Sequence, residues 1–352
     1  QEGYVPDFEN MESFSGQIVH PQTWPEDMDY TGKKVVVIWS GATAATIVPA
    51  MAGTAAHVTM LQRSPTYFYP RPKVSPLEEL LAPLALPPEW THEILRRRYL
   101  LESSVTARRA RKEPDALRAD LLAGARAFLG DDFPIDPHFS PRYPPWRQRI
   151  AVVPDGDLFQ AIARGDASVV TDQIERFTPS GLQLASGDEL EADIIVTATG
   201  FNMSMMGDIP FTVDGTKVDW PATWAHRGIM FSGVPNLAWV FGYLRSSWTL
   251  RADMISDFVC RLLTRMDAGG ANVVIPHLRP EDADMPERPF IEPENFDAGY
   301  IMRKAHILPK QGDRQPWIFS QDYFKERDEI PQADLDDGTL IYASQTQKSL
   351  AS

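Results

Sequence analysis

The chain has 352 residues, of which 43% are hydrophobic and 23% charged, and 48 acidic residues outnumber 34 basic ones, a formal net charge of −14. This composition excludes a disordered tail protein, a collagen-like repeat and a disulfide-stapled miniprotein, and the length predicts two domains or one large one. The negative balance repels polyanions over most of the surface, so we expect no nucleic-acid partner.

The chain has a single cysteine, Cys260, which excludes an intrachain disulfide, and its apolar neighbours predict a buried side chain. The longest apolar-rich stretch, residues 228–244, is interrupted by Gly233 and Pro235, and therefore predicts protein core rather than a transmembrane segment. We expect no secretory signal and a cytoplasmic location.

The first strand and helix patterns follow a loop-like opening at residues 1–30 that is rich in Pro, Gly and aromatic residues. The β-branched run 35–38 is typical of a strand buried on both faces. Small and apolar residues at 45–55 predict a helix, and 57–63 predict a second strand. Strand, turn, helix and strand within about 30 residues predict a βαβ unit.

Residues 70–145 differ in character, because frequent prolines separate two helical patterns at 90–112 and 116–129. They predict a helical insertion. The first helix is strongly basic, which we interpret as a solvated face; the alternative is a surface for anionic lipid or a protein partner. Its basic residues are Arg96, Arg97, Arg98, Arg108, Arg109, Arg111 and Lys112.

Strand patterns return after residue 150. Residues 174–184 predict a hairpin, and 193–197 predict a buried strand that is followed by Gly200. A helix is expected at 250–266, ending at a glycine pair, and a polar tail at 331–352.

The turn after the first strand partly matches the Gly-x-Gly-x-x-Gly/Ala pattern of dinucleotide-binding folds. Gly41 fits the position where backbone approaches the pyrophosphate, and Ala44 fits the small residue that lets helix and strand pack closely, but Trp39 stands at the first glycine position. The turn supplies the first set of candidate cofactor-binding residues, which are Trp39, Ser40, Gly41, Ala42, Thr43 and Ala44.

The end of the second strand carries Arg63 and Ser64, where NAD-binding folds usually place Asp or Glu. A carboxylate would repel a ribose 2′-phosphate, whereas a guanidinium can bind it through two hydrogen bonds. Arg63 therefore favours NADP over NAD. The alternative is an ordinary surface arginine at a strand end.

A third motif lies in the opening segment, where Phe14, Gly16, His20, Trp24 and Pro25 fit the spacing Phe-x-Gly-x-x-x-His-x-x-x-Trp-Pro. With this fingerprint the chain resembles the Baeyer–Villiger flavoprotein monooxygenases, close to their mycobacterial ethionamide-activating branch. The resemblance extends over almost the whole chain.

The resemblance implies an α/β fold with a Rossmann-like NADP-binding domain at 31–197, which contains the helical insertion, and the C-terminal part of an FAD-binding Rossmann-like domain at 198–330. It implies that NADPH reduces FAD, and that a C4a-peroxyflavin formed with O2 inserts one oxygen atom into a small-molecule ketone or oxygenates the sulfur of a thio-compound. Residues 1–30 would then link the nucleotide domains.

The resemblance also implies roles for single residues. Arg149 corresponds to the catalytic arginine beside the flavin, although Arg147 is near in sequence and a structural ion pair is the alternative. His20 and Trp24 would couple the domains rather than act as acid–base catalysts. Further cofactor-binding candidates are Ala198, Thr199, Gly200 and Trp248.

Two departures from the family pattern indicate an alternative function. The sequence has no second, FAD-type glycine-rich turn, so we expect the N-terminal FAD-binding part of the family to lie outside it. Trp39 lacks the conformational freedom of glycine and predicts weak NADPH binding. The alternative is a truncated, non-catalytic nucleotide-binding remnant or pseudoenzyme. Histidine spacing predicts no metal site, and no pattern indicates an oligomeric state.

Overall fold

The computed structural model describes residues 2–344 and divides into two compact units, with the boundary between Asn202 and Met203. The predicted domain boundary, between residues 197 and 198, lies slightly before this division. Within residues 2–344, no helix combines the length and the apolar character needed to cross a membrane.

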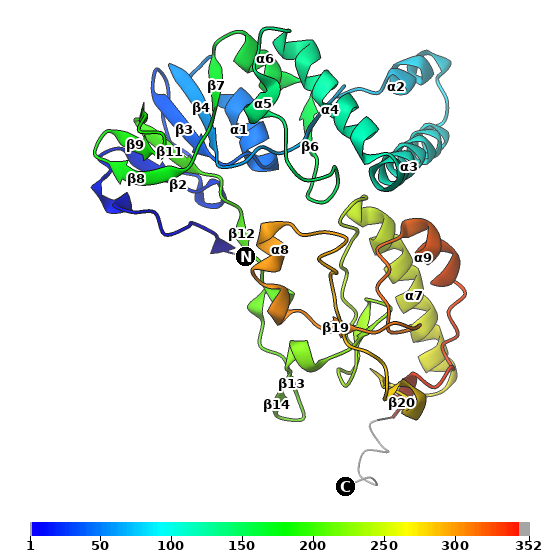
Figure 1. The fold of residues 1–352 in the computed structure, drawn as a ribbon. Coiled ribbons are helices and arrows are strands. Elements are labelled where there is room, and N and C mark those ends of the chain that lie inside the picture. Colours follow the sequence, from blue (N-terminus) through cyan, green and yellow to red (C-terminus); the bar gives the residue numbers. More distant parts are fainter. Residues whose placement is uncertain (1, 345–352) are drawn as a thin grey trace. The chain divides into compact units, whose positions relative to one another are not determined.

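The first unit is built on a five-stranded parallel sheet with the strand order β2-β11-β3-β4-β7 (Figure 1). The strands are β2 (Gln17–Val19), β11 (Ile194–Thr197), β3 (Lys34–Ile38), β4 (His57–Gln62) and β7 (Ala167–Thr171). The predicted α/β class is confirmed, and the hydrogen-bonded registers place the carboxyl ends of β3 and β4 at the same edge of the sheet.

Both faces of this sheet are covered, as the β-branched run of β3 predicts. Val35 and Val37 face a core that includes residues of α1 (Ala42–Met51) and α6 (Asp157–Ala163). Val36 and Ile38 face a second core with Leu182, which lies in a small antiparallel sheet. That sheet consists of β8 (Ile174–Thr178), β9 (Gly181–Leu184) and β10 (Glu189–Glu191), and it includes the predicted hairpin.

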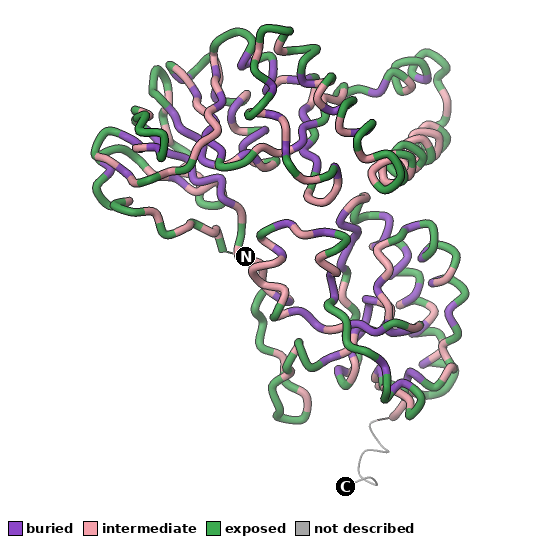
Figure 2. The backbone as a smooth tube through the Cα atoms, viewed as in Figure 1, coloured by how far each residue is buried: buried purple, intermediate pink, exposed green. Residues whose placement is uncertain are grey.

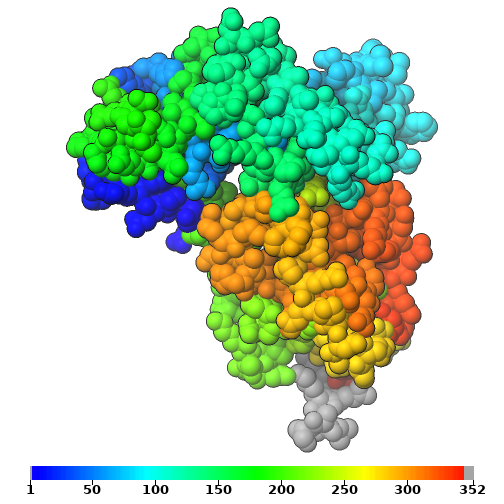
Figure 3. All heavy atoms as spheres, in the orientation of Figure 1, coloured from blue at the N-terminus to red at the C-terminus, as the bar shows by residue number. Residues whose placement is uncertain are grey.

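The helical insertion lies between two paired strands of the first unit, β5 (Phe68–Arg71) and β6 (Ala151–Pro154). It contains α2 (Pro76–Leu81), α3 (Pro88–Lys112), α4 (Pro114–Leu129) and α5 (Ile135–His138), and α2 to α4 form the cyan-to-turquoise surface of Figure 3. No residue of α3 is buried (Figure 2), and ion pairs such as Arg98–Glu102 lie along it, as expected of a solvated helix.

The second unit consists mainly of two-stranded antiparallel sheets and helices. Its longest helix is α7 (Trp248–Ala268), and α9 (Tyr323–Glu329) also belongs to it. The remaining strands and helix are β1 (Glu2–Gly3) and β12 (Phe201–Asn202) in the first unit, and β13 (Thr212–Val213), β14 (Thr216–Lys217), β15 (Ala225–His226), β16 (Met230–Phe231), β17 (Val273–Pro276), β18 (Arg288–Pro289), α8 (Gly299–Met302), β19 (Lys310–Gln311) and β20 (Leu340–Ala343) in the second.

Two expectations for the second unit are wrong. Cys260 is exposed, because its apolar neighbours are divided between the two faces of α7 and only residues such as Phe258 and Leu262 face the core. The segment from residue 331 is not only a polar tail, because β20 pairs with β17 and buries Leu340. Residues 345–352 of the predicted tail lie outside the described residues.

Candidate nucleotide-binding site

The turn between β3 and α1 continues the pairing of β3 with β4 by one more hydrogen bond. The backbone N–H of Trp39 donates to the carbonyl of Leu61 at 2.7 Å. The next residue, Ser40, is buried, and its hydroxyl donates to the carbonyl of Ser64 at 3.2 Å and lies 3.1 Å from the hydroxyl of Thr66. The two loops at this edge of the sheet are therefore tied together.

Trp39 adopts a backbone conformation that normally belongs to glycine. Its φ angle is +103°, in the region where a side chain at Cβ meets the neighbouring backbone. Such a residue costs about 1–3 kcal/mol and persists only where its surroundings hold the backbone. The turn thus keeps the path that a first-position glycine would allow, although it carries an indole.

The N-terminus of α1 provides unpaired backbone donors. Gly41 is the N-cap and has no side chain to accept from the first N–H groups of the helix, which belong to Ala42, Thr43 and Ala44. Together with the positive end of the helix dipole, these donors suit a phosphate group. Ala44 is fully buried against the core, so this position requires a small side chain.

Arg63 follows the last residue of β4 and is exposed at the same edge of the sheet. Its guanidinium carbon lies 5.8 Å from the centroid of the Trp39 ring, within cation–π range. Arg63 therefore lies next to the turn, and that it shares one nucleotide site with the turn residues stays a prediction. Thr66, which contacts Ser40, was missed, because no nucleotide-binding pattern includes it.

The strand end before Arg63 is held by a partly buried polar network. The Gln62 side-chain amide donates to the carbonyl of His138 at 2.6 Å and to the hydroxyl of Thr171 at 2.9 Å. The His138 Nδ1 lies 2.9 Å from the same hydroxyl, and burial lowers the pKa of His138 below its usual value. A neutral imidazole at neutral pH therefore helps to fix the backbone that presents Arg63.

These residues fit the charged parts of NADP, with one obstacle. The α1 N-terminus fits a pyrophosphate and Arg63 fits a 2′-phosphate, but the Trp39 indole lies between them. For FAD the fit differs: among residues 2–344, the sheets of the second unit are antiparallel pairs, without a second strand–turn–helix phosphate site. The same range holds no cluster of His, Cys, Asp or Glu side chains suited to a metal ion.

The fingerprint begins with two residues that pack closely at the edge of the sheet. Phe14 is buried and its ring lies 6.4 Å from that of Phe177, edge to face. A Cβ atom on Gly16 would lie 2.3 Å from the carbonyl oxygen of Asp193 and 2.6 Å from the Phe14 ring. The glycine of the fingerprint is therefore required by close backbone packing.

His20 brings together two motifs that the sequence places 180 residues apart. Its Nε2 lies 3.1 Å from the carbonyl of Gly200, and its Nδ1 accepts from the N–H of Gln22 at 3.2 Å, so the Nε2 tautomer carries the proton. Thr199 donates its hydroxyl to the carbonyl of Tyr4. The fingerprint and the turn after β11 thus form one hydrogen-bonded element next to the end of the first unit.

The other predicted residues are distant in sequence from the turn between β3 and α1. Trp24 and Pro25 follow a short 3-10 helix, and Trp24 packs, partly buried, against the core of the first unit. Arg149 is exposed in the loop before β6, close to Arg147. Trp248 begins α7 in the second unit, and its ring lies 5.2 Å from that of Phe241. Ala198 is buried at the end of β11.

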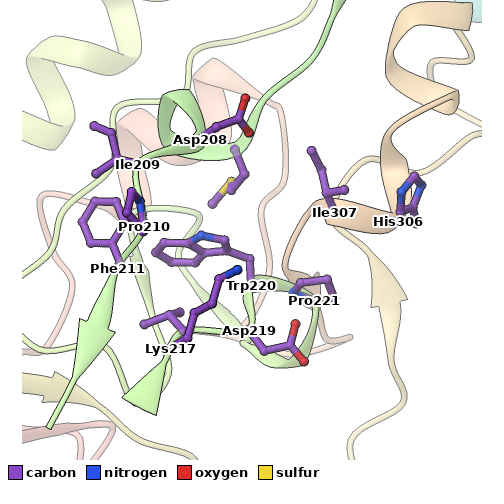
Figure 4. Close-up of a pocket in the computed structure, with 12 residues that line it drawn as sticks. Asp208, Ile209, Pro210, Phe211, Lys217, Asp219, Trp220, Pro221, His306 and Ile307 are labelled. Atoms are coloured by element: carbon purple, nitrogen blue, oxygen red, sulfur yellow. The ribbon is translucent and has the colours of Figure 1, made fainter. Parts of the chain in front are cut away.

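The second unit contains a cavity of about 610 Å³ that sequence analysis did not predict. Figure 4 shows the Trp220 indole at its centre, with Phe211 and Ile307 on either side. Residues near 205–221 and 306–307 line it, and only folding brings these two segments together. Its apolar surface would accept a small apolar molecule.

Comparison with known proteins identifies relatives that match nearly the whole chain. No family model matches the chain. The chain is 46% identical to the FAD-containing monooxygenase EthA of Mycobacterium tuberculosis over 343 residues, covering 97% of this chain and 69% of the relative. It is 42% identical to the probable FAD-binding monooxygenase AlmA of Acinetobacter baylyi, covering 98% of this chain and 68% of the relative.

Solved structures share the fold at lower identity. A steroid monooxygenase described as oxidised and bound to NADP matches with a TM-score of 0.68 at 19% identity, covering 98% of this chain and 73% of that one. The OTEMO complex with FAD and NADP matches with a TM-score of 0.67 at 18% identity, covering 97% and 74%. The predicted resemblance to flavoprotein monooxygenases is confirmed, and the chain belongs to the family of FAD-containing monooxygenases.

Proposed function

We propose that this chain acts as an NADPH- and FAD-dependent monooxygenase of Baeyer–Villiger type that inserts one oxygen atom from O2 into a small-molecule ketone or oxygenates a sulfur. Identities of 42–46% to FAD-containing monooxygenases over nearly the whole chain support the reaction class. The position of Arg63 at the mouth of the βαβ turn carries the choice of NADP.

The nucleotide would lie across the carboxyl edge of the parallel sheet. The backbone of the turn from Ser40 to Ala44 would hold the pyrophosphate at the N-terminus of α1. The Arg63 guanidinium and the Ser64 hydroxyl would bind the ribose 2′-phosphate, since a planar guanidinium forms paired hydrogen bonds with phosphate oxygens. This arrangement selects NADP over NAD, because the loop after β4 presents the Arg63 guanidinium where a carboxylate would repel the 2′-phosphate.

Bound FAD would supply the redox chemistry, which is hydride uptake from NADPH and activation of O2. This chain would contribute a fixed cation through Arg149, which stabilises negative charge that develops near the reacting atoms. Further residues proposed to help bind a cofactor are Ala198, Thr199, Gly200 and Trp248. The fingerprint of Phe14, Gly16, His20, Trp24 and Pro25 favours the ketone reaction. We also infer a cytoplasmic location.

Arg63 provides the sharpest test of the cofactor choice. Arg63→Ala should weaken NADP+ binding by about 10- to 100-fold and leave NAD+ binding within about twofold, because only the 2′-phosphate loses its partner. Arg164→Ala is the matched control, since Arg164 is an exposed arginine of the same unit that pairs with Asp166. Calorimetric titration of both nucleotides measures the effect; equal losses for NADP+ and NAD+ contradict the assignment.

A second candidate is a nucleotide-binding protein without flavin chemistry, which the Trp39 indole in the turn favours. Reconstitution separates the two. Purified protein incubated with FAD should acquire the visible absorption of an oxidised flavin, and NADPH should bleach it if the proposed function holds. A protein that binds NADPH and stays colourless after incubation with FAD supports the second candidate instead.

A further inference from the structure

The Trp39 indole occupies the space between the two parts of the proposed nucleotide site. A Cβ atom on Gly41 would lie 3.8 Å from Cδ1 of the indole, so the ring lies beside the N-cap of α1. The ring centroid is 5.8 Å from the guanidinium carbon of Arg63. The same side chain therefore contacts both the place for a pyrophosphate and the place for a 2′-phosphate.

The backbone around Trp39 holds the indole in this position. The backbone has a φ angle of +103° at Trp39, and the hydrogen bond from Trp39 N–H to the Leu61 carbonyl fixes that residue at the sheet edge. Ser40, on the other side, is fixed by its contacts with Ser64 and Thr66. The ring cannot leave by a shift of the turn without breaking these bonds; it must leave by rotating its side chain.

We propose that Trp39 is a self-occluding residue that excludes the adenosine 2′-phosphate portion of NADP by filling the ribose space and holding the Arg63 guanidinium against its ring. This inference rests on the proposed function, because it takes Arg63 as the 2′-phosphate partner. Binding then requires the indole to swing out, so the chain binds the nucleotide more weakly than its turn and its arginine would allow.

The probe is adenosine 2′,5′-bisphosphate, which carries the ribose and 2′-phosphate without a nicotinamide. Titration by calorimetry should show binding to Trp39→Gly at least tenfold tighter than to the unsubstituted chain. Trp39→Phe is the matched control, because it keeps an aromatic ring at the same φ beside the Arg63 guanidinium and should stay within about threefold of the unsubstituted chain. Glycine tolerates the positive φ, so Trp39→Gly should also melt at a higher temperature, which verifies that the variant is folded.

The outcomes separate the two proposals. Equal or weaker binding by Trp39→Gly overturns the occlusion, and weaker binding would mean that the indole stacks on the adenosine. If Trp39→Gly fails while Arg63→Ala still weakens the bisphosphate, the proposed cofactor choice stands and the occlusion alone is wrong. If Arg63→Ala leaves the affinity of both the unsubstituted chain and Trp39→Gly unchanged, the proposed nucleotide site is wrong as well.

Discussion

The two units bury their interiors in different ways. The first unit places alternating aliphatic side chains of one parallel sheet against helices on one face and a small sheet on the other. The second unit surrounds a buried ion pair, Arg251 with Glu326 at 2.8 Å, with an aromatic cluster and short strand pairs. Its buried aromatic residues include Phe231, Phe241, Phe290 and Phe319.

This difference separates two sources of stability. Aliphatic burial in the first unit is distributed over many side chains and tolerates conservative exchange. In the second unit Arg251 is fully buried, donates to the backbone carbonyls of Gly228, Phe241 and Arg227, and lies 4.4 Å from the Phe319 ring centroid. A single side chain there joins several segments, so its loss should be far more damaging.

The strongest test of this comparison removes the buried cation. Arg251→Met should lower the free energy of unfolding by about 3–5 kcal/mol, because Glu326 is left as an unpaired buried charge. Hydrogen exchange should increase in residues 226–243 and not in 35–62. The control Arg265→Met removes a half-exposed partner of Asp336 from the same helix as Arg251 and should cost at most about 1 kcal/mol. Equal costs for the two variants would remove the distinction between the units.

Gly16 tests whether the packing of the first unit is also sensitive to a change at a single residue, as expected for Arg251 in the second unit. Gly16→Ala should cost about 1–3 kcal/mol, because the new Cβ atom would press on the Asp193 carbonyl and the Phe14 ring. Gly41→Ala is the control in the same unit, since its Cβ atom would meet only Trp39, at an ordinary 3.8 Å. Urea unfolding measures both. A Gly16→Ala variant as stable as Gly41→Ala is the contrary result.

Acid should destabilise the second unit through His226. Burial lowers its pKa from 6.5 to about 3, so below pH 6.5 the unfolded chain takes up a proton that the folded chain refuses. Stability is therefore lost as the pH falls through this window, by about 1 kcal/mol between about pH 7 and about pH 5.5. His226→Gln should lose this contribution to the pH dependence of stability while keeping a hydrogen-bond donor for Thr339. If the free energy of unfolding in urea depends on pH equally in the variant and the unsubstituted chain, the burial of His226 is not the cause.

The smallest expected effect concerns the hydrogen bonds of the fingerprint histidine. His20→Ala removes the contacts with the Gly200 carbonyl and the Gln22 N–H and should cost about 1 kcal/mol. Hydrogen exchange should increase locally at residues 197–202. His92→Ala, on the exposed α3 helix, serves as control and should stay within about 0.5 kcal/mol. Unchanged exchange at 197–202 would show that His20 does not hold this turn.

Much of the first unit was predictable from local patterns. Residues 35–38 and 57–63 predict strands through their β-branched and apolar composition, and the turn between them predicts a helix N-terminus. Because carboxyl ends of neighbouring parallel strands meet at one edge, the proximity of Trp39 and Arg63 follows from the βαβ prediction. Family membership followed from the spacing of the fingerprint residues.

The sequence by itself determined the βαβ module, the family and the candidate nucleotide residues, since these depend on short-range order and spacing. Only the tertiary structure decided the positive φ of Trp39, the contact of His20 with Gly200, the exposure of Cys260 and the pairing of β20 with β17. Each of these depends on which distant segment packs alongside, and a local pattern carries no information about a partner that lies far away in the chain.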